Sequence, residues 1–289
     1  MSVAALIPGL AARLPLRLLH AAGGLLGWAA YLLSPTYRRL FRANLSLAYP
    51  DFPGRLRRAA IAHAGRSIAE LPYIWLRPDA EVRALVREVI GQELIDSAIS
   101  EGRGIVYLTP HLGCFEIAAR YVAGFAPITV LYRPPRQAWL RDFVEQGRAG
   151  QNVRLARADL GGVRMLIRAL RRREAIGILP DQVPRRGEGV WAEFFGRPAY
   201  TMTLAARLVR TSGAALLLAV AERLSNGRGY RLTIHCPGDA VEDRPSEQGA
   251  TINRMMEQLI RACPEQYLWA YDRYKRPAGA PAPGSSAEG

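Results

Sequence analysis

Short apolar runs alternate with helix-like runs along most of the chain, and this alternation constrains the fold more than any other feature. Runs of strand length and strand-like composition lie at 86–90, 104–109, 128–132, 175–179, 215–221 and 230–235. Helical patterns lie at 54–76, 92–100, 115–124, 138–147, 163–172, 203–210 and 252–262. Strands that alternate with helices favour a sheet covered on both faces. The sequence therefore predicts an α/β fold with a mixed, mostly parallel sheet flanked by helices, and 289 residues suffice to bury its core.

The most informative motif lies where the predicted strand 104–109 meets the next helix. Its sequence is Thr109-Pro110-His111-Leu112-Gly113-Cys114-Phe115-Glu116. This places the His111 imidazole at the carboxyl edge of the sheet, where α/β proteins build their sites, and Glu116 in the first helical turn. A carboxylate so placed can accept the ring N–H and free the other nitrogen to act as a base. The pair suits a reaction in which a substrate hydroxyl attacks; the alternative is a structural histidine.

Two other predicted strands also end in polar side chains. Arg133 follows strand 128–132, and Asp181 with Gln182 follows strand 175–179. In a parallel sheet these ends face the same crevice as His111, so Arg133 is expected to bind a phosphate or an acyl oxygen. Asp181 and Gln182 would orient Arg133 or bind substrate, unless Asp181 only caps a turn. Three aromatic residues downstream either line an apolar slot or pack in the core: Trp191, Phe194 and Phe195.

Charge and cysteine content limit the classes of partner and site. The net charge of +14 favours an anionic partner: nucleic acid, an acidic membrane surface or an acidic carrier protein. Three cysteines at wide spacing, with four histidines that never pair at metal-binding spacing, argue against a disulfide framework and a structural zinc. Cys114 inside the motif is an alternative nucleophile, although a buried thiol is the commoner role for such a residue.

The two ends of the chain differ in composition from the middle. Residues 18–33 are mostly apolar and lie between Arg13 and Arg17 on one side and Arg38, Arg39 and Arg42 on the other. This run is marginal for a spanning helix, so we expect a membrane-associating helix at the interface, with a buried core helix as the alternative. We therefore divide the chain into an anchoring segment (1–45), a catalytic domain (46–277) and a disordered tail (278–289) rich in Pro, Gly, Ala and Ser.

These motifs together resemble the lysophospholipid acyltransferase superfamily, and more closely its bacterial lipid A secondary acyltransferase branch of lauroyl and myristoyl transferases. The resemblance spans about residues 25–275. It is carried by His111 to Glu116 as a His-x4-Glu box, Leu131-Tyr132-Arg133-Pro134, Gly161-Gly162 with Ile178-Leu179-Pro180-Asp181-Gln182, Phe194-Phe195-Gly196 with Thr201, and Pro264 to Trp269 with Arg273-Tyr274-Lys275. One position departs from the pattern: many members carry histidine where this chain has Tyr271, which weakens inferences about acceptor recognition by the C-terminal block.

The resemblance implies a glycerolipid acyltransferase-like fold and transfer of a fatty acyl chain from acyl-acyl carrier protein to a hydroxyl of a lipid A precursor. It also implies a location on the cytoplasmic face of the inner membrane, with no metal or other cofactor. His111 would be the general base, Glu116 would hold its imidazole, and Arg133, Asp181 and Gln182 would bind substrate. The basic charge would suit an acidic carrier protein, an anionic glycolipid acceptor and the membrane.

Three other interpretations remain at this stage. An acyltransferase of the same fold would act on a lysophospholipid or another glycolipid. A basic nucleic-acid-binding protein would explain the charge, but the arginines are dispersed and no nucleic-acid-binding motif is present, so we expect no such partner. An inactive membrane scaffold would have no need of both His111 and Glu116.

Overall fold

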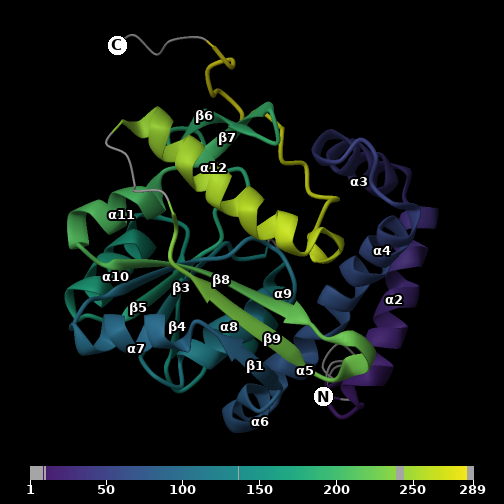
Figure 1. Ribbon diagram of the computed structural model, residues 1–289, viewed down its shortest axis with the longest axis horizontal. Helices are drawn as coiled ribbons and strands as arrows, with labels where there is room; N and C mark the ends of the chain where they lie inside the picture. Colours follow the sequence, from purple (N-terminus) through teal and green to yellow (C-terminus); the bar gives the residue numbers. More distant parts are fainter. Residues whose placement is uncertain (1–8, 10, 136, 239–243, 285–289) are drawn as a thin grey trace.

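The core of the protein is a seven-stranded sheet in the order β1-β9-β8-β2-β5-β3-β4 (Figure 1). The computed structural model describes residues 9, 11–135, 137–238 and 244–284. The strands are β1 (Val86–Ile90), β2 (Ile105–Leu108), β3 (Ile128–Tyr132), β4 (Val153–Arg157), β5 (Ala175–Ile178), β8 (Ala215–Arg223) and β9 (Tyr230–His235). Neighbouring strands run parallel except β8 and β9, which are antiparallel. The predicted mixed, mostly parallel α/β sheet is confirmed.

Helices cover both faces of this sheet. They are α2 (Leu16–Leu33), α3 (Pro35–Ala48), α4 (Gly54–Ala69), α5 (Leu71–Leu76), α6 (Asp79–Arg83), α7 (Gln92–Ser100), α8 (Phe115–Val122), α9 (Ala138–Arg148), α10 (Leu160–Arg171), α11 (Leu204–Ser212) and α12 (Pro245–Ala262). Strand β2 divides its side chains between two apolar clusters, because successive residues of a strand point to opposite faces. Val106 and Leu108 pack with residues of α10, α11 and α12, whereas Ile105 and Tyr107 pack with residues of α7, α8 and α9.

Several elements are absent from the sequence-based prediction. Strand β4 contains Arg154 and Arg157, which are exposed at the edge of the sheet, so it has no continuous apolar run. The aromatic run at 191–195 belongs to a separate antiparallel hairpin, β6 (Gly189–Phe194) and β7 (Arg197–Met202), which packs against α12. Helix α12 begins at Pro245, seven residues before the expected start, since its first turns are polar.

The apolar N-terminal helix α2 packs lengthwise against α4, and glycines form the contact. A Cβ on Gly65 would lie 2.0 Å from the carbonyl oxygen of Gly23 and 2.3 Å from the amide nitrogen of Gly27, so only glycine allows the two helices to approach this closely. Helix α2 is long and apolar enough to cross a membrane by length and composition alone. One side of it is nevertheless buried in the protein, while Leu25 and Leu33 on the opposite side are 73% and 81% exposed.

A buried ion pair connects these helices to the sheet. Glu70, at the end of α4, receives hydrogen bonds from Arg223 of β8 at 2.5–3.0 Å, and both side chains are 1% exposed. The same carboxylate contacts His20 Nε2 of α2 at 3.0 Å and accepts a hydrogen bond from the Tyr230 hydroxyl of β9 at 2.9 Å. Burial alone would raise the pKa of Glu70, but the charge of Arg223 and hydrogen bonds from His20 and Arg223 lower it to about 2.

Two residues of the segment 278–289, for which a disordered tail is predicted, contact the rest of the protein. Ala280 is buried against Val183 and Tyr200, and the indole N–H of Trp191 donates to the Pro281 carbonyl at 2.9 Å. Ala280 and Pro281 thus lie beside the β6–β7 hairpin. Residues 285–289 lie outside the described part of the chain, and for them the tail stays a prediction.

Substitution of Gly65 by alanine tests the close α2–α4 contact. In a helix interior, Gly→Ala normally stabilises by about 1 kcal/mol. Here we expect Gly65→Ala to destabilise the protein by about 1–3 kcal/mol, because the methyl group collides with the α2 backbone. Urea unfolding in detergent gives the free energy of each variant. Gly54→Ala is the control, since its Cβ would meet nothing nearer than 3.9 Å; equal behaviour of the two variants would contradict the packing.

Substitution of Glu70 by glutamine tests the buried ion pair. We expect Glu70→Gln to lower the free energy of unfolding by about 3–5 kcal/mol at pH 7, because Arg223 stays buried without its counter-charge. A carboxyl whose folded-state pKa is depressed stabilises above its unfolded pKa of 4.5 and loses this contribution as the pH falls towards about 2. Wild-type stability should therefore decline across this window, and the decline should be shallower in the variant.

The matched control for this substitution is Glu93→Gln, which neutralises an exposed carboxylate on α7. It should change the unfolding free energy by less than about 0.5 kcal/mol. A Glu70→Gln protein as stable as this control would show that the ion pair does not hold the helices to the sheet.

Candidate active site

Three neighbouring strands deliver the predicted site residues to one edge of the sheet. Strand β5 lies between β2 and β3, so the loops that carry His111, Arg133 and Gln182 emerge side by side. All three residues line a single cavity of about 230 Å³. The expectation that these strand ends face a common crevice is confirmed.

His111 is held by the residue pair that follows β5. Its Nδ1 lies 2.8 Å from Asp181 Oδ1, and its backbone N–H donates to Asp181 Oδ2 at 2.9 Å. Its Nε2 lies 3.1 Å from the side-chain nitrogen of Gln182. Since an ionised carboxylate only accepts, Nδ1 carries the proton, and Nε2 accepts a hydrogen bond from the Gln182 amide. The imidazole therefore has the tautomer that a general base requires, with Nε2 as its basic atom.

Asp181 is well suited to this role because it stays ionised. Burial alone would raise its pKa, since its side chain is only 2% exposed. The positive charge that the His111 ring carries when protonated, two hydrogen bonds from that residue and the charge of Arg273 outweigh burial, and the pKa of Asp181 is lowered overall. A buried carboxylate of this kind fixes the imidazole and stabilises the imidazolium formed during proton transfer.

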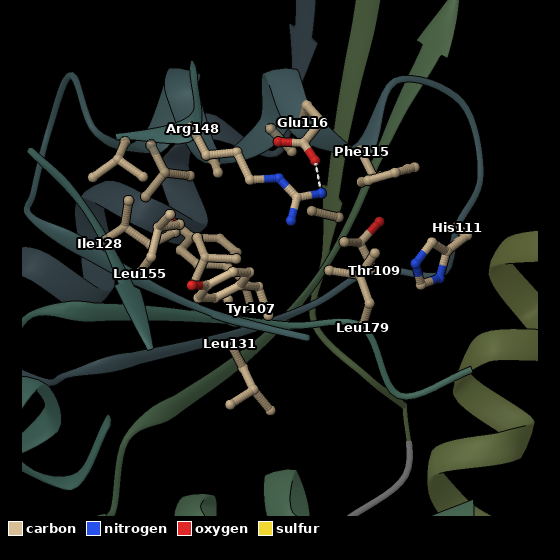
Figure 2. Close-up of a pocket in the computed structure, with 18 of the residues that line it drawn as sticks. Tyr107, Thr109, His111, Phe115, Glu116, Ile128, Leu131, Arg148, Leu155 and Leu179 are labelled. Atoms are coloured by element: carbon tan, nitrogen blue, oxygen red, sulfur yellow. Dashed lines mark hydrogen bonds and ion pairs between the residues drawn. The ribbon is translucent and has the colours of Figure 1, made fainter. Parts of the chain in front are cut away.

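Glu116 does not contact the imidazole in this way, and the expectation that it accepts the ring N–H is wrong in this structure. Its Oε1 forms an ion pair with Arg148 of α9, and its Oε2 accepts a hydrogen bond from the Trp75 indole of α5 at 3.2 Å. Figure 2 shows Glu116 turned towards Arg148, apart from His111. The five-residue spacing permitted a contact between Glu116 and His111 but did not require one. Asp181, from the loop after β5, contacts the imidazole instead.

The loop that carries His111 is fixed by backbone contacts on several sides. Gly113 has a φ of +59°, and a Cβ there would lie 2.1 Å from the Ala221 carbonyl oxygen, so glycine is required. The Gly113 N–H donates to the Gln266 carbonyl at 3.1 Å, and its carbonyl accepts from Arg223 at 2.6 Å. The Leu268 N–H donates to the His111 carbonyl at 3.1 Å. The C-terminal segment and β8 together hold the imidazole in place.

The cavity continues from His111 between the sheet and α8, where its lining is mostly apolar (Figure 2). Side chains from several strands contribute: Ile128, Val130, Val153, Leu155, Leu232 and Ile234. The ion pair of Glu116 and Arg148 is also at its wall. The hydroxyl of Tyr107 is buried there and has no hydrogen-bond partner among the described residues. A largely apolar space of this kind suits an alkyl chain.

Some predicted residues lie elsewhere. Arg133 is exposed at the edge of the cavity, and no hydrogen bond or ion pair joins it to Asp181 among the residues that the structure describes. The aromatic residues of the 191–195 run do not line this cavity, because they pack in the hairpin and core. Cys114 is 2% exposed, and burial raises the pKa of its thiol, which opposes its role as a nucleophile.

Sequence reasoning missed two residues of the cavity wall and one support. Arg148 directly follows the predicted helix 138–147. In a chain so rich in arginine, its sequence position does not mark it as a functional residue. Tyr107 looked like one more core residue of β2. Tyr271, the position that departs from the family pattern, supports the site loop: its hydroxyl accepts a hydrogen bond from the Val183 N–H at 3.0 Å.

Comparison with known proteins assigns the chain to a single family. The model described as bacterial lipid A biosynthesis acyltransferase matches residues 3–276. The chain is similar to a lipid A biosynthesis lauroyltransferase of Escherichia coli (strain K12), at 31% identity over 283 residues that cover 94% of this chain and 90% of the relative. It is similar to a lipid A biosynthesis palmitoleoyltransferase of the same organism at 29% identity over 245 residues, covering 82% and 79%. A lipid A biosynthesis acyltransferase of Haemophilus influenzae is 29% identical over 275 residues, covering 91% and 86%. The chain belongs to the bacterial lipid A biosynthesis acyltransferase family, as its motifs predicted.

Proposed function

We propose that this acyltransferase moves a fatty acyl chain from acyl-acyl carrier protein to a hydroxyl of a lipid A precursor, with His111 as the general base. The observation that carries the proposal is the pairing of His111 with the buried carboxylate of Asp181 at an apolar cavity. An oriented base beside an alkyl-sized space is what acyl transfer to a hydroxyl requires.

The reaction needs no acyl-enzyme. His111 Nε2 takes the proton of the acceptor hydroxyl as the oxygen attacks the thioester carbonyl carbon. The tetrahedral intermediate then collapses, the carbon–sulfur bond breaks, and the imidazolium returns the proton to the departing sulfur. Asp181 holds Nδ1–H throughout and stabilises the positive ring by its charge. The products are an ester and a free carrier thiol, so atoms and protons balance.

Gln182 has a particular place in this scheme. Its amide N–H donates a hydrogen bond to Nε2 of His111, the atom to which the acceptor hydroxyl must donate. The hydroxyl therefore displaces the amide, which becomes free to donate to the oxyanion of the intermediate. Arg133 at the edge of the same cavity supplies a second donor for that oxygen or for a phosphate of the substrate.

Glu116 acts through Arg148 in this proposal. The ion pair and the Trp75 hydrogen bond join α8 to α9 and α5 beside the cavity, so Glu116 keeps the guanidinium of Arg148 at its wall. A cation there can bind a phosphate of the donor's prosthetic group or of the acceptor. Glu116 is thus a positioning residue, whereas His111 is the catalytic residue.

Charge and surface support the proposed partners and location. The net charge of +14 suits an acidic carrier protein and a phosphorylated glycolipid acceptor. Leucines on the free side of α2 are exposed, among them Leu18, Leu25 and Leu33, and exposed arginines lie before and after the helix. We propose that α2 rests on the cytoplasmic face of the inner membrane, with these leucines in the lipid and the arginines on anionic head groups.

Removal of the base should nearly abolish transfer. Wild-type protein in detergent, with labelled lauroyl- or myristoyl-acyl carrier protein and a tetra-acylated, Kdo-bearing lipid A precursor, should form a labelled product. His111→Ala should lower kcat by about 10²–10⁴-fold, because positioned acid–base groups contribute that much. Circular dichroism and thermal unfolding check that the variant is folded.

Two outcomes of this assay would change the proposal. Equal turnover by wild type and folded His111→Ala would exclude the imidazole as the base. Transfer to a lysophospholipid but not to the lipid A precursor would retain the chemistry and reject the proposed acceptor.

Two carboxylate variants separate the base-orienting role from the positioning role. Asp181→Asn should lower kcat by about 10²–10⁴-fold, since the amide no longer fixes the Nδ1–H tautomer or stabilises the imidazolium. Glu116→Gln should mainly raise KM for the acyl donor or the lipid acceptor, because the neutral amide no longer holds Arg148 by its charge. Steady-state kinetics against both substrates distinguishes the two effects.

Asp51→Asn is the control, since it neutralises an exposed carboxylate distant from these contacts. It should leave both kinetic parameters unchanged. A Glu116→Gln variant that loses kcat as severely as Asp181→Asn, with KM intact, would show that Glu116 acts directly on the imidazole during turnover.

A further inference from the structure

A second hollow lies apart from the acyl cavity, between the N-terminal helices and the turn that joins β8 to β9. Figure 1 shows this turn beside the start of α2. It has a volume of about 590 Å³. Arg17 and His20 of α2 line one side, His63 and Arg66 of α4 another, and Arg228 closes it from the turn. The turn packs tightly on α2: a Cβ on Gly227 would lie 2.5 Å from the Arg17 backbone. The fold therefore holds these basic groups around one space.

The lining of this hollow has an excess of positive charge. Two further lining arginines have counter-charges: Glu70 for Arg223, and both Glu88 and Glu222 for Arg231. The other three, Arg17, Arg66 and Arg228, form no ion pair with a carboxylate in the described part of the chain. Two carboxylates are among the lining residues of the hollow, Glu222 and Glu265. Because Arg231 shares one positive charge between Glu88 and Glu222, two uncompensated negative charges face the three arginines, and the lining keeps a small excess of positive charge.

His63 adds a hydrogen-bond donor that lacks an acceptor. Its Nε2 lies 3.2 Å from Arg66 Nη1, and a guanidinium can only donate. Nε2 is therefore the accepting nitrogen, and the proton of the neutral ring is on Nδ1. That nitrogen is buried and has no partner among the described residues. Burial and the charges of Arg223 and Arg66 lower the pKa of His63 to about 3, as expected for a buried ring among cations.

We propose that this hollow binds a phosphate group, with Arg17, Arg66 and Arg228 as its cations and His63 as a neighbouring ring that responds to its charge. Guanidinium groups match the oxygens of phosphate in geometry and charge. No contact with the acyl cavity is needed, so this inference does not depend on the proposed reaction.

The surroundings indicate two sources for such a phosphate. Leu18 and Leu25 are exposed on α2, the helix that also carries Arg17, so the head group of a phospholipid lying against that helix could reach the hollow. A soluble phosphate compound would enter the same space from solution. In both cases Arg223 connects the ligand site to the loop that carries His111, since Arg223 lines the hollow and also donates to the Gly113 carbonyl at 2.6 Å.

The test uses the full chain in detergent and a probe that requires no turnover. Inorganic phosphate is titrated at constant ionic strength, with chloride as the compensating salt, while the thermal midpoint and the His63 imidazole resonances are followed. We expect a saturable rise of the midpoint. We also expect the pKa of His63 to rise with phosphate, because a nearby anion favours the imidazolium.

The variant Arg17→Gln with Arg228→Gln removes two exposed cations of the hollow and should bind phosphate at least about tenfold more weakly. The matched control, Arg55→Gln with Arg58→Gln, removes two exposed arginines of α4 that do not line the hollow and should bind as wild type does. Absence of a saturable shift in wild type, or equal weakening in both double variants, would overturn the proposal.

Vesicles distinguish the two sources. Phosphatidylcholine vesicles are prepared with phosphatidic acid, whose phosphate is a monoester, or with phosphatidylglycerol as the anionic comparison. If the Arg17/Arg228 variant loses the preference for phosphatidic acid while the control keeps it, the ligand is a lipid head group. If vesicle binding is the same in both variants while only inorganic phosphate binding is lost, the ligand is a soluble phosphate compound.

Discussion

The buried ion pair of Glu70 and Arg223 is the interaction on which the rest of the structure depends. It joins the end of α4 to β8, and the same two side chains contact His20 of α2, Tyr230 of β9 and the carbonyl of Gly113. Two charges taken out of water cost free energy unless both are fully hydrogen-bonded, and here both have several partners. The N-terminal helices, the antiparallel end of the sheet and the loop that carries His111 are therefore held by one network, so displacement of α2 or α4 would disturb that loop.

The site itself is assembled across strands rather than within one motif. His111 follows β2, and the carboxylate that orients it follows β5, the adjacent strand in the sheet but 70 residues further along the chain. Glu116, five residues from His111, contacts α5 and α9 instead and shapes the wall of the cavity. The two acidic side chains thus have different partners, and a parallel sheet explains why, because its loops meet at one edge whatever their order in the chain.

Much of the architecture could be predicted, and the errors have identifiable causes. Buried strands such as β2 and β5 have unbroken apolar sequences, and the strand-turn-helix that contains His111 was confirmed. Strand β4 was missed because its arginines are exposed at the sheet edge. The aromatic run at 191–195 was compatible with a ligand slot or with core packing, and only the β6–β7 hairpin shows that it packs in the core. Arg148 and Tyr107 carry no local signal, since their importance comes from the cavity that they line.

The sequence by itself determined the α/β class, the position of His111 at the carboxyl edge of the sheet and the family, because apolar periodicity and an ordered set of motifs are local properties of the chain. Only the tertiary structure decided which carboxylate contacts His111, where the acyl-sized cavity runs and that α2 is buried along one side by glycine contacts with α4. These depend on distances between segments far apart in the chain. Such distances are set by the packing of helices on the sheet and by side-chain direction, and neither property is encoded in the spacing of residues along one element.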